Sequence, residues 1–256
     1  MKKCSLLLLL FVINAIVLML PSCKVMYIPN KQNVPLFKSS NEVQVAAGPF
    51  DFQAAYSVNK HLGLIANAQF QTYRSTLRDD DDTIFYEKNR SVTRLIEFGA
   101  GYYTMLNSGF NFQAFGGFGF GKNSVEIDIM EQQSSQVFKT NSLSANTARF
   151  FIQPALGFTS RGVDFAVSCR VVMLNYYNVE NKGYSLEQLY LDSFWEIDKN
   201  SYCFIEPAIT MRFGMPNAKF HIQYVYSGLT SGAILSYMPF RINFGIHVNL
   251  FAPVKK

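Results

Sequence analysis

The chain has 256 residues, of which 49% are hydrophobic and 15% aromatic, and its formal net charge is +5. This length allows one domain with a substantial core, or one barrel. Lys2 and Lys3 belong to a predicted export signal, so the exported chain would carry only about +3. A charge this weak and this scattered excludes nucleic acid as a predicted partner.

Residues 1–22 have the pattern of an export signal. Lysines near the start precede an apolar run over Leu6–Leu20 that only Asn14 interrupts. The run is short for a membrane span, which needs about 20 apolar residues, so we predict that the segment is cleaved. Cys23 directly follows Leu20-Pro21-Ser22, which resembles the lipobox of bacterial lipoproteins. We therefore predict that Cys23 is acylated; the alternative is ordinary cleavage nearby, with Cys23 incidental.

Residues 23–41 show no sustained period, and Pro29 and Pro35 interrupt them, so this stretch is predicted to be an extended, lipidated tether. Residues 42–256 form the predicted barrel domain. Ten strands are expected there: Glu42–Ala47, Asp51–Val58, Leu62–Leu77, Val92–Leu106, Phe110–Asp128, Thr147–Ser160, Val163–Val179, Ser201–Gly214, Lys219–Leu229 and Pro239–Phe251.

The segment Phe240–Phe251 shows the alternation that defines these strands. Its even-numbered residues are apolar from Phe240 to Leu250, whereas Arg241, Asn243 and the following odd-numbered residues are mostly polar. Successive side chains of a strand point to opposite faces, so one face is apolar and the other polar. At about 3.3 Å per residue the strand is roughly 36 Å long, and a tilt near 45° leaves roughly 25 Å of height, the apolar band of an outer-membrane barrel.

The connections alternate in length. Tight turns of three or four residues begin at Asn59, Asn107, Ser160 and Met215, and longer polar loops lie between them. Within one of these loops, Ser185–Leu191 could form one or two helical turns. Short turns at one end and long loops at the other are typical of outer-membrane barrels, with the short turns periplasmic. An even strand number then predicts a periplasmic N-terminus.

A soluble barrel would hide the same apolar face inside. Strand length and aromatic content favour the membrane: the third to tenth predicted strands have 11 to 19 residues, and globular strands usually have about 5–6. The 24 Phe, 14 Tyr and one Trp are also more than a small interior can hold. Aromatic residues near strand ends suit the two membrane interfaces.

Polar residues on the inward face are predicted to form a network in the lumen. Its members are Glu97, Arg170, Glu206, Arg212, His221, Arg241 and His247. No catalytic residue, metal or cofactor is predicted. Two alternatives use the same residues: a metal held by His221, His247 and a third ligand such as Glu206, or a hydrolytic set of Ser227, His221 and Glu206. Both require side chains from several strands to converge.

Two smaller patterns have structural interpretations. Cys169 and Cys203 lie on consecutive strands in a register that separates them, so no disulfide is expected. Glycines crowd Phe115–Gly121 without a following helix, so they indicate a narrow lumen and not a phosphate-binding loop.

Taken together, Leu20–Cys23 and the strand pattern resemble the small outer-membrane β-barrel proteins of diderm bacteria with a lipoprotein-type signal. Asn243–Phe251 is similar to the C-terminal strand signal read by the barrel-insertion machinery. The resemblance implies an all-β, antiparallel up-and-down (meander) transmembrane barrel of 8–10 strands, in the outer membrane. Its partners would be outer-membrane lipids and the insertion machinery.

The inward carboxylates and guanidiniums, without a nucleophile constellation, favour a non-enzymatic envelope protein with a structural or interaction role and a largely plugged lumen. A soluble, lipid-tethered periplasmic barrel that binds an apolar ligand is the main alternative. A lipid-modifying barrel enzyme and a small pore are further alternatives, because fold alone does not choose a function.

Overall fold

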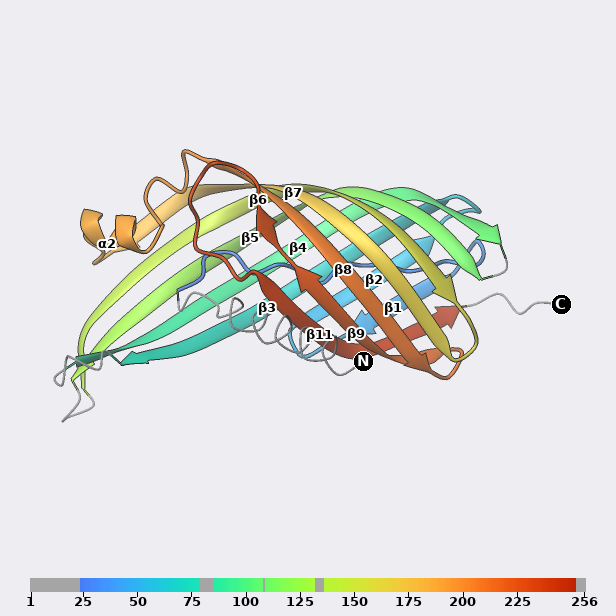
Figure 1. The fold of residues 1–256 in the computed structure, drawn as a ribbon, viewed down its shortest axis with the longest axis horizontal. Coiled ribbons are helices and arrows are strands. Elements are labelled where there is room, and N and C mark those ends of the chain that lie inside the picture. Colours follow the sequence, from blue (N-terminus) through green and yellow to red (C-terminus); the bar gives the residue numbers. More distant parts are fainter. Residues whose placement is uncertain (1–23, 79–84, 108, 132–135, 252–256) are drawn as a thin grey trace, which may run out of the picture.

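The computed structural model describes residues 24–78, 85–107, 109–131 and 136–251, and Figure 1 shows them as one tilted barrel. The fold is all-β, and the strands follow one another around the ring in chain order. The strands are β1 (Val43–Ala47), β2 (Asp51–Ser57), β3 (Leu62–Arg78), β4 (Phe85–Asn107), β5 (Phe110–Glu131), β6 (Val137–Thr159), β7 (Val163–Lys182), β8 (Ser201–Gly214), β9 (Ala218–Tyr226), β10 (Gly228–Leu229) and β11 (Phe240–Phe251).

Antiparallel pairing closes the ring. β1 pairs with β11, β11 with β9, and β9 with β8. The short β10 continues β9 along β8 in the same register, since Val225 lies opposite Ala208 and Gly228 opposite Ile205. The barrel wall is therefore ten strands around, and the predicted antiparallel meander is confirmed.

The strands β4, β5 and β6 are longer than predicted. β4 begins at Phe85 and not at Val92, and β6 begins at Val137 and not at Thr147. Much of the predicted long loops is therefore paired strand that extends the barrel beyond its apolar band, as the left side of Figure 1 shows. The helix α2 (Leu186–Leu191), predicted within Ser185–Leu191, lies at this same long-loop end.

The barrel turns its apolar face outward. Phe244 is 51% exposed and its neighbour Asn243 only 3%, and Ile152 and Ile242 are also among the exposed large hydrophobic residues. The predicted sidedness is thus confirmed: apolar residues cover the outside, and polar residues line the interior. No helix in the described part of the chain is long and apolar enough to span a bilayer.

The two cysteines of the barrel do not pair. Cys169 lies opposite Pro207, and Cys203 lies opposite Met173, so four residues of β7 separate them along the sheet. Both are free thiols, as the sequence predicted.

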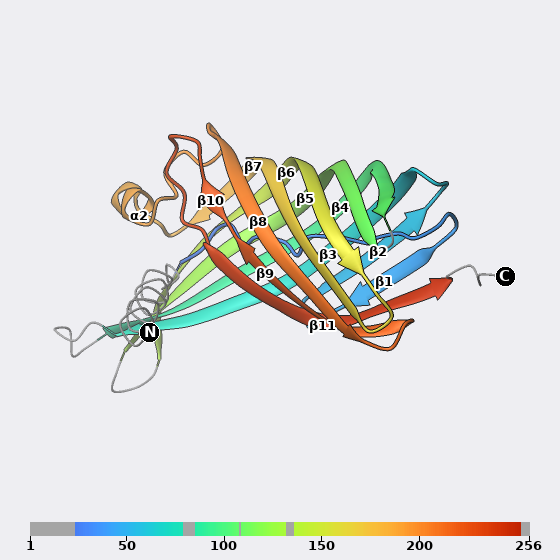
Figure 2. The ribbon, with the colours of Figure 1, turned by 45° about the vertical axis from the view of Figure 1, so that its right-hand side comes forward.

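The segment Lys24–Phe37 runs through the lumen. Every residue from Val25 to Phe37 is buried, although none belongs to a strand of the wall. Figures 1 and 2 show this stretch, in blue, passing from the long-loop end of the barrel to the short-turn end, where β1 begins. The sequence analysis predicted an extended tether outside the barrel domain. In the structure, this segment fills the lumen of the barrel.

Candidate functional site

Side-chain amides of the wall bind the backbone of the N-terminal segment. The Gln223 amide accepts from the backbone N–H of Gln32 at 2.7 Å and donates to its carbonyl at 2.9 Å. Gln153 donates to the carbonyl of Asn33 at 2.8 Å, and Gln53 donates to that of Lys31 at 3.0 Å. An extended chain away from water needs partners for its backbone groups, and these amides replace the neighbouring strand that it lacks.

Glu97 is the centre of the charged network. It is fully buried and contacts Arg149 at 2.5–2.7 Å and Arg170 at 3.5 Å. The N-terminal segment adds Asn30, whose side-chain N–H donates to the same carboxylate at 2.5 Å. Arg170 also donates twice to the Gln153 amide, at 2.6 and 2.9 Å. The wall and the segment thus share one carboxylate between them.

Small residues on the inward face make room for this network. The Arg170 guanidinium lies 4.6 Å from the centre of the Phe151 ring. A Cβ at Gly117 would collide with that ring and with the carbonyl oxygen of Phe98. Gly99 abuts the same ring, which agrees with the narrow lumen predicted from the glycines.

Glu206 binds the segment at a second point. The Tyr27 hydroxyl donates to its carboxylate at 2.6 Å, and Ser227 donates to the same oxygen at 3.0 Å. The Tyr27 ring stacks on Phe204, with their centres 4.3 Å apart. Glu206 also lies opposite Arg170 in the register of β7 and β8. Tyr27 is therefore held by both its ring and its hydroxyl.

The remaining predicted arginines bind the segment farther toward the short-turn end. Arg212 donates to the carbonyl of Val34 at 2.6 Å, and Arg241 donates to that of Pro29 at 2.8 Å. Asp51 lies between two cations: Lys31 of the segment at 3.0 Å and Arg241 at 3.5 Å. All of these groups are buried, so each charge depends on its partners.

The two lumen histidines, His221 and His247, contact different residues. His221 contacts the Arg212 guanidinium at 3.1 Å, and His247 contacts Gln44 at 3.2 Å. They lie two residues out of register, since His221 is opposite Gly245. Together with Glu206, which faces Tyr27, they do not converge on a metal, and the described residues contain no group that could hold one. The hydrolytic alternative also fails to assemble, because Ser227 reaches Glu206 but His221 does not join them.

Lys24 holds the start of the segment at the long-loop mouth. Its ammonium group lies 3.1 Å from Glu87 on β4 and 3.1 Å from Asp192, which caps the C-terminal end of α2. Partial burial raises the pKa of Asp192, and the nearby Lys24 lowers it in opposition. Burial also raises the pKa of Tyr184. The Ser185 hydroxyl and Gln188 form a capping box that fixes α2 here.

All seven residues of the predicted network are thus buried in the lumen, but they form several clusters joined by the segment. The sequence analysis missed Arg149 and the partners in the segment: Tyr27, Asn30, Lys31 and Gln32. For Arg149 a signal was present, because the apolar Phe150 and Ile152 alternate along the same strand and place Arg149 on the opposite, inward face. The segment itself has no hydrophobic periodicity, so its sequence showed no sign that it fills the lumen.

No protein-family model and no curated protein matches this chain. Three solved structures with a similar fold are outer-membrane β-barrel proteins. The outer membrane protease OmpT from Escherichia coli aligns over 82% of this chain and 92% of its own, with a TM-score of 0.42 and 6% identity. LpxR from Salmonella typhimurium aligns over 81% and 98% (TM-score 0.31, 8% identity), and CarO from Acinetobacter baumannii over 86% and 100% (TM-score 0.29, 8% identity).

These comparisons agree with an outer-membrane barrel, and they correct one prediction. The sequence analysis inferred a non-enzymatic protein from the polar lumen and the absence of a catalytic set. OmpT is a protease with the same kind of barrel, so this inference from fold and lumen is wrong. A filled lumen does not exclude catalysis, because a barrel can also act at its mouth or outer surface.

Proposed function

We propose that the N-terminal segment closes the lumen of this outer-membrane barrel, so that the protein acts at its outer surface and does not pass solutes. One observation supports this above all: Lys24–Phe37 is bound along its length by residues from opposite sides of the wall, such as Glu97 on β4 and Gln223 on β9. Any binding or catalytic work would then belong to the mouth and the exterior.

The energetics favour a segment that stays in place. A typical hydrogen bond adds about 0.5–1.5 kcal/mol net, and a buried group left without its partner costs about 1–3 kcal/mol. If the segment left, Asp51 would lose Lys31, and Glu206 would lose Tyr27. Water could solvate these groups in an open lumen, but the stacked Tyr27 ring and the buried Phe37 would also become exposed.

We further propose that the long loops face the cell exterior. β1 begins and β11 ends at the short-turn end, which would be periplasmic. Lys24 lies at the opposite end, so the predicted periplasmic N-terminus is replaced by one at the outer mouth. Cys23 lies outside the described residues, and its acylation stays a prediction. Acyl chains attached directly before Lys24 would have to reach the outer leaflet.

Conductance in planar bilayers tests the closed lumen. The full-length protein should pass no steady current. A variant in which Asn30, Lys31 and Gln32 are replaced by glycine should open, because it loses the side-chain contacts to Glu97, Asp51 and Ser168. The matched control carries glycine at three exposed positions of the loops, 198–200. Wild-type conductance at the nanosiemens level, equal to that of the variant, would refute the proposal.

Labelling of whole cells tests the orientation. Single cysteines at Glu187 in α2 and at Asn217 in a short turn, on a background with Cys169 and Cys203 replaced by serine, provide the two probes. A membrane-impermeant maleimide should modify position 187 in intact cells and position 217 only after permeabilisation. The reverse pattern would place the long loops in the periplasm.

A further inference from the structure

The exterior of β3, β4 and β5 carries a row of cations immediately above the apolar band. The last large apolar residues that face outward are Phe70, Ile96 and Phe120, which are 58%, 48% and 55% exposed. One step farther toward the long-loop end, the outward residues of β4 and β5 are Arg94 and Lys122. The change from apolar to cationic surface thus occurs within two residues on β4 and β5.

The strand register places like charges directly opposite each other. Arg94 pairs with Lys122 across β4 and β5, and Arg74 pairs with Arg90 across β3 and β4. Like charges at directly opposed positions are destabilising, so two such pairs side by side are unfavourable without an anion between them. Glu126 lies opposite Arg90 and compensates that cation, so among the described residues the Arg94–Lys122 pair is the one left without an anion.

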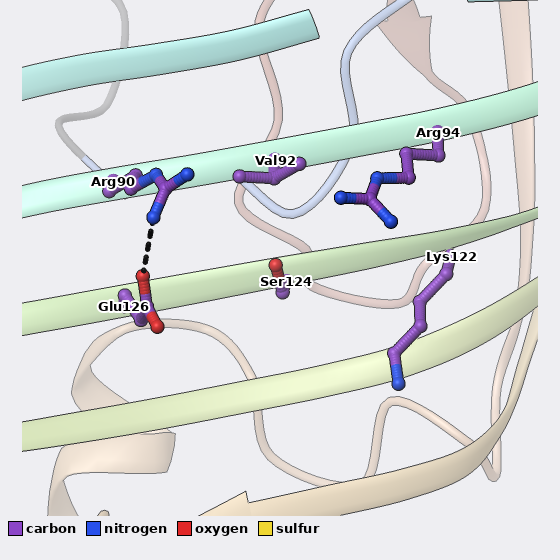
Figure 3. A pocket seen from close by; sticks show the side chains of 6 residues that line it. All are labelled: Arg90, Val92, Arg94, Lys122, Ser124 and Glu126. Atoms are coloured by element: carbon purple, nitrogen blue, oxygen red, sulfur yellow. Dashed lines mark hydrogen bonds and ion pairs between the residues drawn. The ribbon is translucent and has the colours of Figure 1, made fainter. Parts of the chain in front are cut away.

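A hollow of about 290 Å³ lies between these strands, and Figure 3 shows the residues that line it: Arg90, Val92, Arg94, Lys122, Ser124 and Glu126. An ion pair of 3.3 Å joins Arg90 to Glu126 at one end. Arg94 and Lys122 line the other end, and within the described parts of the chain no carboxylate forms an ion pair with either of them. An adjoining hollow reaches Phe70 on β3.

At the border of the apolar band, the row of cations lies on one side of the barrel. At the corresponding border on the other side, the residues that follow the apolar Met173 and Phe150 are Asn175 and Ala148, which lie opposite each other. Ser201 continues this row on β8. Cations that only attract a membrane surface could be spread around the whole barrel. Because this row lies on β3–β5, it indicates a local binding site.

We propose that this groove binds the phosphate groups of an outer-leaflet lipid. The acyl chains would lie against the aromatic surface of Phe98, Phe118 and Phe120, and the phosphates would reach Arg94 and Lys122. Guanidinium and ammonium groups form charge-assisted hydrogen bonds with phosphate, and basic pockets at the membrane border hold anionic headgroups. The alternation of aromatic and basic surface matches a lipid better than a free anion, because only a lipid uses both parts.

Retention of a defined lipid tests this site. The full-length protein, in nanodiscs of phosphatidylcholine with a small fraction of diphosphoryl lipid A, is compared with the Arg94→Gln/Lys122→Gln variant by native mass spectrometry. The wild type should retain lipid A and the variant should lose affinity about tenfold or more, as expected for two cations near a headgroup. The control Lys139→Gln/Lys199→Gln removes the same charge from exposed positions of the long-loop region and should retain lipid A.

Two outcomes would overturn the proposal. Equal retention by the wild type and by a folded Arg94→Gln/Lys122→Gln variant would show that the groove does not select phosphate, and heat-dependent gel mobility verifies the fold. Complete displacement of lipid A by millimolar inorganic phosphate would show that the aromatic surface adds nothing and that the site is for a free anion. Neither result bears on the closed lumen, which conductance tests separately.

Discussion

The lumen and the exterior groove use arginine in opposite ways. Inside, Arg149 and Arg170 share Glu97, and Arg241 has Asp51. Outside, Arg94 faces Lys122 with no carboxylate in an ion pair to either of them in the described residues. These three interior arginines thus have carboxylate partners within the protein itself. The exterior ones are arranged for a partner that is not part of the chain.

This difference separates residues that maintain structure from residues available for binding. A buried charge without a partner is costly, so each lumen arginine must be compensated when the protein folds. A half-exposed arginine is solvated and can remain without a partner at little cost. The two regions therefore make opposite predictions for the removal of a charge.

Loss of Glu97 should have the largest effect. Glu97→Ala leaves Arg149 and Arg170 buried without their shared carboxylate and should destabilise the barrel by about 3–5 kcal/mol. Unfolding by guanidinium in lipid vesicles measures this. The control Glu126→Ala removes the exposed partner of Arg90 and should cost about 1 kcal/mol or less. Equal losses of stability in the two variants would mean that water solvates the charges of the lumen as well as those of the exterior.

Loss of the Tyr27 hydroxyl should have the second largest effect on stability. Tyr27→Phe retains the stacking on Phe204 but removes the hydrogen bond to the Glu206 carboxylate. A hydrogen bond to a charged group is worth about 1.5–3 kcal/mol, and the loss should appear in the free energy of unfolding. Tyr190→Phe in the exposed part of α2 provides the control and should change nothing measurable. No loss at Tyr27 would argue that the segment leaves the lumen in the membrane.

The alternation of residues predicted the wall well. The bounds of β8 are those predicted, and Phe244 and Asn243 face the predicted sides. This information is local, since a period of two is visible within one strand. The extensions of β4 and β6 were missed because runs of polar residues, such as Glu87–Ser91 and Lys139–Ser142, interrupt the alternation and give a pattern typical of loops.

The role of the N-terminal segment could not be predicted in the same way. Gln32 contacts Gln223, and Asn30 contacts Glu97, so its partners lie far away in the sequence. The groove was missed for a related reason. The opposition of Arg94 and Lys122 depends on the exact pairing of β4 with β5, and a shift of two residues would separate the charges.

The ion pair between Lys24 and Asp192 should have a small, pH-dependent effect on the free energy of unfolding. Burial raises the pKa of Asp192 above its unfolded value, so its ionisation opposes folding as the pH rises through the folded pKa. Asp192→Asn should therefore be slightly stabilising at neutral pH, by about 1 kcal/mol or less, and neutral at a pH below the unfolded pKa. Unfolding at both pH values measures the difference, with Asp198→Asn in the exposed loop as control. A variant less stable at neutral pH would show that the pair with Lys24 outweighs the burial.

Removal of a groove cation should have the smallest effect and the opposite sign to removal of Glu97. In detergent without anionic lipid, Lys122→Gln relieves the repulsion with Arg94 and should stabilise the barrel by about 0.2–1 kcal/mol. Lys139→Gln is the control, because Lys139 lies opposite Ile129 and has no like charge to lose. Added diphosphoryl lipid A should reverse the sign and make the wild type the more stable protein. If Lys122→Gln were destabilising without lipid, the protein itself would satisfy this cation, and the distinction between the two regions would fail.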